Sequence, residues 1–116
     1  MNNKKPKQHD CITSKESLDR CFSLVREELS KAETKFPGFP DDLLHGVCIL
    51  SEESGEAVRA ALHVVYENGS VEEYKKELVQ TAAMAIRALI DLEIREQEVK
   101  NKALLSTRQL ALNLED

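Results

Sequence analysis

Apolar residues recur at three- and four-residue intervals through much of the chain, as they do on the buried face of an α-helix. The first such stripe predicts a helix that begins at a capping box formed by Thr13 and Glu16. The segment 36–40, Phe-Pro-Gly-Phe-Pro, must end this helix, because proline disfavours helical conformation at the residue before it. The predicted buried residues of this helix are Leu18, Phe22, Val25 and Leu29.

A second helix is predicted after the prolines, over about residues 43–67, with Asp41 or Asp42 as its N-cap. The turn-forming pair Asn68-Gly69 stops it. Its apolar face has small residues in the middle, and Gly55 inside a helix suggests the close approach of a neighbouring helix. The predicted face consists of Leu44, Val47, Cys48, Ser51, Ser54, Gly55, Val58, Ala61, Leu62 and Val65.

A third helix is predicted from Val71 to at least Asp91, with Ser70 and Glu73 as a second capping box. The short connection makes the second and third helices an antiparallel hairpin. The predicted fold is therefore all-α: an antiparallel helical hairpin core plus an N-terminal helix, which completes a helical bundle by oligomerisation. The predicted apolar face of the third helix is Leu78, Val79, Ala82, Ala83, Ile86, Leu89 and Ile90.

This pattern divides the chain into three parts. Residues 1–12 are predicted to be a disordered arm, residues 13–92 a helical domain, and residues 93–116 a helical extension or a frayed tail. Leucines return near the end of the last part, where they would dock on a partner subunit if the extension is helical.

The composition agrees with an all-α chain and excludes some classes of function. Aromatic residues make up 4% of the chain, and the common residues are helix formers. The net charge of -5 argues against a nucleic-acid polymer as partner. No stretch is apolar enough to cross a membrane, and the basic first ten residues lack the apolar run of a secretory signal, so we expect a cytoplasmic protein. Three separated cysteines predict neither a zinc site nor structural disulfides.

A group of carboxylates supplies the candidate chemistry. Glu52, Glu53 and Glu56 crowd one flank of the second helix, where like charges repel one another unless a cation offsets them. On the third helix, Glu77 and Gln80 share a line with Met84 and Arg87, and the hairpin brings the middles of the two helices together. A solvated acidic face is the alternative interpretation, since the chain has 21 acidic residues.

These motifs resemble those of the MazG-like all-α nucleoside triphosphate pyrophosphohydrolases, which carry Glu-Glu-x-x-Glu on one helix and Glu-x-x-Asp on the next. The matching segments are 51–57, Ser-Glu-Glu-Ser-Gly-Glu-Ala, and 77–85, Glu-Leu-Val-Gln-Thr-Ala-Ala-Met-Ala. The Phe-Pro-Gly-Phe-Pro segment also resembles one branch of the family. Gln80 departs from the pattern, because it stands where the family has aspartate.

The resemblance implies Mg²⁺-dependent hydrolysis of nucleoside triphosphates, with deoxynucleotides as the expected substrates, to a monophosphate and pyrophosphate. Mn²⁺ is the expected substitute for Mg²⁺. It implies that Glu53, Glu56, Glu77 and Gln80 bind the metal, with Gln80 either as a weaker ligand or as an outer hydrogen-bonding group. Glu52 or Glu53 is the expected proton acceptor. The implied assembly is a homodimer or a homotetramer.

Four further residues are candidates for substrate binding. Arg59 follows Glu56 by about one helical turn, and Arg87 follows Gln80 by about two turns. Each would hold a phosphate oxygen or balance nearby glutamates, and the remaining candidates are Lys76 and His45. The main alternative function is a non-catalytic helical interaction module with a degenerate metal site. A di-iron carboxylate bundle is disfavoured, since its Glu-x-x-His pairs are missing.

Overall fold

The computed structural model describes residues 5–114, where every regular element is a helix, which confirms the all-α part of the predicted fold. Its helices are α1 (Lys15–Lys35), α2 (Leu43–Tyr66) and α3 (Val71–Leu114). No helix among the described residues is long and apolar enough to span a membrane. Residues 1–4 of the predicted arm and residues 115–116 of the predicted extension lie outside the described range.

Local sequence explains where the helices begin and end. Asp42 caps α2 by accepting a hydrogen bond from the Leu44 amide at 2.8 Å. The sequence had predicted either Asp41 or Asp42 as this N-cap, and the structure selects Asp42. The Ser70 hydroxyl accepts from the Glu73 amide at 3.3 Å at the start of α3. The prediction for α1 was wrong by one residue: Ser14, not Thr13, is the N-cap, because its side chain accepts from the Ser17 amide at 3.1 Å.

The turn between α2 and α3 is tight. Asn68 adopts a left-handed φ of 55°, which asparagine tolerates better than most residues. The Gly69 amide donates to the His63 carbonyl at 2.8 Å, and a Cβ on Gly69 would lie 2.7 Å from the His63 Cβ. Glycine is therefore required at 69, and the chain returns at once into α3.

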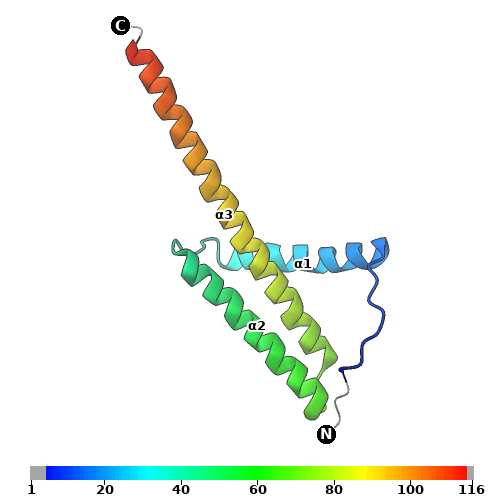
Figure 1. The fold of residues 1–116 in the computed structure, drawn as a ribbon. Coiled ribbons are helices and arrows are strands. Elements are labelled where there is room, and N and C mark those ends of the chain that lie inside the picture. Colours follow the sequence, from blue (N-terminus) through cyan, green and yellow to red (C-terminus); the bar gives the residue numbers. More distant parts are fainter. Residues whose placement is uncertain (1–4, 115–116) are drawn as a thin grey trace.

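The three helices form an open arrangement rather than a closed bundle. α2 lies beside the first half of α3, α1 runs across α3, and the second half of α3 projects beyond both (Figure 1). The overall dimensions are 79 × 35 × 33 Å. Among the described residues, the buried apolar side chains are only Ala57 and Ala83.

The face of α2 that packs inside the chain differs from the predicted one. The side chains turned toward the other elements are buried or half-buried, namely Gly46, Ile49, Leu50, Glu53, Ala57, Ala60, Ala61 and Val64. The predicted stripe is instead mostly exposed, with Leu44 at 68% and Val65 at 69%. The predicted reason for Gly55 is also wrong within this chain, because a Cβ there would meet nothing within 4 Å.

α1 shows a smaller discrepancy of the same kind. Of its predicted buried stripe, Val25 and Leu29 are half-buried, whereas Leu18 and Phe22 are exposed. On α3, Ala83 is fully buried as predicted, but Leu78 and Leu89 are exposed. Each of the predicted apolar stripes is therefore covered only in part within the single chain.

Candidate metal centre

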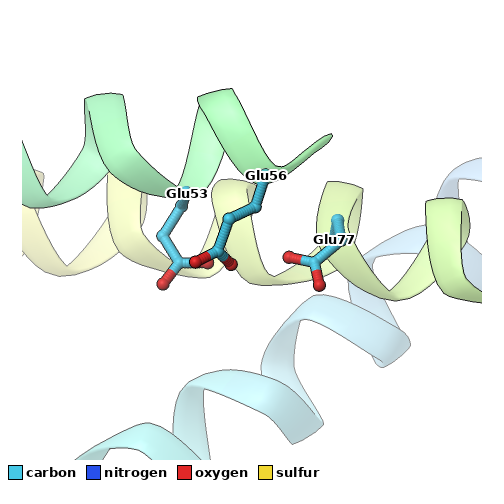
Figure 2. Close-up of side chains that lie close together, drawn as sticks. All are labelled: Glu53, Glu56 and Glu77. Carbon is cyan, nitrogen blue, oxygen red and sulfur yellow. The ribbon is translucent and has the colours of Figure 1, made fainter. Parts of the chain in front are cut away.

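Three carboxylates from two helices converge beside the contact between α2 and α3. Glu53 and Glu56 lie one turn apart on α2, and Glu77 reaches toward them from α3 (Figure 2). One oxygen of each lies within 4.8 Å of the others. Two oxygens that bind one Mg²⁺ are at most about 4.2 Å apart, so small side-chain rotations would bring all three onto one ion.

The burial of this cluster makes it different from a solvated acidic face. Glu53 and Glu77 are half-buried, while Glu56 is exposed. One oxygen of Glu53 and one of Glu77, Oε2 in both, are buried without a hydrogen-bond partner among the residues described. Buried polar atoms without partners are rare, because each carries a desolvation cost. A cation bound between them would supply the missing interaction.

The electrostatics of the cluster agree with its geometry. The pKa of Glu53 is raised above that of an ordinary glutamate, first by burial and then by the charges of Glu56, Glu28 and Glu52. The pKa of Glu77 is raised as well, again mainly by burial. A hydrogen bond to Glu56 and the charge of Glu56 raise it further, and the positive charge of Lys76 lowers it. Without a cation, the cluster therefore favours bound protons.

The two other residues expected near the metal occupy different positions. Glu52 is exposed and does not belong to the group of three converging carboxylates. Gln80 is half-buried and lines a cavity of about 510 Å³ that also borders Glu53. Its predicted role as a metal ligand stays a prediction.

The cavity lies between the end of α1, the proline segment and the facing sides of α2 and α3. Its apolar lining includes Phe36, Phe39, Ile49 and Met84, and its size falls in the range of small-molecule sites. Lys31 and Glu28 of α1 line it too, and the sequence analysis did not single them out. Both residues lie beside the apolar stripe of α1, and this was the one sequence feature that could have identified them. The sequence near α1 does not show that this side of the helix faces Glu53.

The structure separates the four predicted substrate-binding residues. Arg59 is exposed and borders a second hollow of about 310 Å³ together with Glu56 and Glu77. Lys76 is exposed and close enough to lower the pKa of Glu77, and His45 is exposed at the start of α2. Arg87 is buried, at 9% exposure, and lines the 510 Å³ cavity with Glu53 and Gln80. Its guanidinium donates to the proline segment, and its predicted contact with a phosphate stays a prediction.

Arg87 and Arg95 fasten the proline segment to α3. Arg87 donates to the carbonyls of Phe36 at 2.6 Å and Gly38 at 3.0 Å, and its guanidinium lies 5.4 Å from the centre of the Phe39 ring. Arg95 donates to the carbonyls of Pro40 and Asp41 and pairs with Asp91 at 2.8 Å. Because the segment forms one wall of the cavity, these two arginines fix the shape of that wall.

Comparisons with protein-family models, with curated proteins and with solved structures give no match to this chain.

Proposed function

We propose that this protein is a magnesium-dependent nucleoside triphosphate pyrophosphohydrolase of the MazG-like kind. The observation that carries the proposal is the convergence of Glu53, Glu56 and Glu77, with two buried oxygens that have no hydrogen-bond partner among residues 5–114. Oxygen ligands of this kind are those that Mg²⁺ prefers, and Mn²⁺ would substitute for it.

The surroundings support a nucleotide as substrate. The cavity that borders Glu53 has the size and the apolar walls to enclose a nucleoside, and Gln80 offers an amide beside it. Arg59 shares a hollow with Glu56 and Glu77, where its charge would attract phosphate oxygens. Triphosphate and nucleoside would thus lie on the two sides of the carboxylates.

The proposed reaction assigns separate tasks to the glutamates. Glu53, Glu56 and Glu77 would hold the cation, which would supply positive charge to the triphosphate and lower the pKa of a water molecule. Glu52 is exposed and outside the group of three, so it is free to accept the proton of the attacking water. A bond forms between the water oxygen and the α-phosphorus, the bond to the bridging oxygen breaks, and pyrophosphate leaves.

Assembly belongs to the same proposal. The helical hairpins of α2 and α3 from two or four copies would complete a bundle, since one chain alone buries very few apolar side chains. A homodimer or homotetramer with a cytoplasmic location is the state in which we expect the enzyme to act.

To test this, the protein is incubated with a panel of ribo- and deoxynucleoside triphosphates, and the release of pyrophosphate and monophosphate is measured. We expect turnover that requires Mg²⁺, that is lost in Glu56→Gln and that persists in Glu96→Gln, an exposed glutamate outside the cluster. No turnover with any nucleotide, together with no effect of Mg²⁺ on the melting temperature, would favour the non-catalytic interaction module instead.

A further inference from the structure

The cavity between α1, the proline segment and the α2–α3 hairpin contains a carboxylate that the proposed reaction does not use. Glu28 of α1 lines this cavity and is half-buried. It lies close enough to Glu53 that its charge, after burial and Glu56, helps to raise the pKa of Glu53. Glu28 is nevertheless not a member of the group of three converging carboxylates. It therefore belongs to the cavity rather than to the candidate metal centre.

The carboxylate of Glu28 is not neutralised by a neighbouring cation. Lys31, about one turn farther along α1, lies 3.7 Å from Glu27 instead. Within residues 5–114, Glu28 takes part in no ion pair. Because an ionised carboxylate offers two acceptor oxygens and no donor, Glu28 can accept hydrogen bonds from a molecule that occupies the cavity.

The other polar groups of the cavity are less able to select an occupant. Arg87 already donates to two carbonyls of the proline segment. Lys31 and Lys35 are exposed, so water competes for their charges. The amide of Gln80 both donates and accepts, and rotation by half a turn exchanges the two, so it fits many different polar edges. Glu28 is the lining group that accepts only and has no other task.

The cavity walls suit a flat ring whose polar edge meets Glu28. Phe36, Phe39, Ile49 and Met84 supply apolar surface, and aromatic and thioether groups pack well against planar rings. A carboxylate accepts a hydrogen bond from the exocyclic amino group of a base such as cytosine. Uracil carries a carbonyl oxygen at the same position, and its single N–H lies between two carbonyl oxygens that would repel the carboxylate. A base with an amino group therefore complements Glu28.

We propose that Glu28 determines the base specificity of the enzyme by accepting a hydrogen bond from an exocyclic amino group of the base. Nucleotides of amino-bearing bases should then bind more tightly than those in which a carbonyl oxygen replaces the amino group. This inference rests on the proposed function, because it takes a nucleotide as the occupant of the cavity. A hydrogen bond to a charged group is strong enough to change the affinity by about tenfold or more.

The test compares two pairs of bases in which the amino group is exchanged for a carbonyl oxygen: cytosine with uracil, and adenine with hypoxanthine. Their α,β-imido deoxynucleoside triphosphates resist cleavage at the α-phosphorus, so calorimetry with Mg²⁺ present measures binding without turnover. The parent chain should bind the amino member of at least one pair about tenfold more tightly. In Glu28→Gln this ratio should fall close to one, because an amide donates to the carbonyl oxygen as well as it accepts from the amino group.

Glu27→Gln is the matched control, since it removes the same charge one residue earlier on α1. Glu27 does not line the cavity, but it borders a neighbouring hollow of about 300 Å³ together with Glu28 and Lys76. Any effect of charge in that hollow would therefore appear in both variants, whereas the base ratio should change only in Glu28→Gln. Binding of Mn²⁺ should be the same in Glu28→Gln as in the parent chain. A tenfold weaker binding of Mn²⁺ would make Glu28 a metal ligand and overturn the proposal.

The outcomes separate this inference from the proposed reaction. Equal affinity of the parent chain for both members of each pair, or an unchanged ratio in Glu28→Gln, would overturn the role of Glu28 even if natural nucleotides are hydrolysed. The expected ratios without any hydrolysis of natural nucleotides would support the contact with the base and contradict the reaction. No binding of any of the four analogues would overturn both.

Discussion

Removal of the Arg87 guanidinium should destabilise the fold much more than removal of any exposed arginine. Arg87 is the buried charged residue among those the structure describes, and its two hydrogen bonds join α3 to a segment about fifty residues earlier. Arg87→Met keeps most of the aliphatic stem and removes both donors. The test therefore isolates the polar contacts from the packing of the side chain.

The expected magnitude follows from the contacts. A hydrogen bond from a charged donor contributes roughly 1.5–3 kcal/mol. Phe36 and Gly38 are exposed, so water can reach the released carbonyls, and the lower value applies to each bond. The contact with the Phe39 ring adds about 0.5 kcal/mol. The total loss is about 3.5 kcal/mol, most of it due to the two hydrogen bonds.

Thermal and urea unfolding at one fixed protein concentration would measure this loss. Arg59→Met is the matched control, because Arg59 is exposed and a surface substitution should change the unfolding free energy by about 0.5 kcal/mol or less. Arg87→Lys keeps the charge but not the fork of donors, so its effect should be intermediate. A loss below about 1 kcal/mol in Arg87→Met, or one equal to that of Arg59→Met, would refute the reasoning.

Three other substitutions have defined outcomes. The raised pKa of Glu53 means that its ionisation destabilises the metal-free fold as the pH rises above the ordinary glutamate range. Glu53→Gln should therefore raise the melting temperature of the metal-free protein at pH 8 but not at pH 4. The same substitution should remove the stabilisation by Mg²⁺. An unchanged melting temperature at pH 8 would contradict this reasoning. Gly46→Ala should destabilise the fold by about 1–2 kcal/mol in urea unfolding, because the new Cβ would lie 2.9 Å from the Phe39 ring. Asp42→Ala removes the α2 cap and should cost about 1 kcal/mol, while a neutral result would show that the cap is dispensable.

Signals that lie within a few residues of one another were predictable from the sequence. The Asp42 cap, the Ser70 cap and the break at residues 36–40 each depend on adjacent groups, and the structure has all three. The choice between Thr13 and Ser14 was not predictable, because both are good N-cap residues and their order of preference is set by small differences in backbone geometry.

Long-range contacts were harder to predict. Arg87 was expected to bind phosphate or to balance a glutamate, but its acceptors are carbonyls about fifty residues away, and nothing in the neighbouring sequence identifies them. The α2 stripe illustrates a different limit. Its apolar pattern predicted burial, but most of the stripe is exposed in the structure, because periodicity reports which side of a helix is apolar and not which surface packs against it.

The carboxylate cluster was predictable in its composition but not in its burial. Helical spacing was enough to place Glu53 and Glu56 together, and a short turn was enough to bring Glu77 near them. The burial of one oxygen on each of Glu53 and Glu77 depends on how tightly the helices pack, which spacing does not report. That burial is the feature that turns an acidic face into a candidate cation site.

Cation binding by the carboxylate cluster is tested most directly by titrating the metal-free protein with Mn²⁺ and monitoring the loss of the free-ion electron paramagnetic resonance signal. We predict saturable binding that Mg²⁺ displaces, that weakens at least about tenfold in Glu77→Gln, and that is unchanged in Glu96→Gln. Absence of saturable binding, or equal binding by the parent chain and Glu77→Gln, would contradict the assignment of a cation to this cluster.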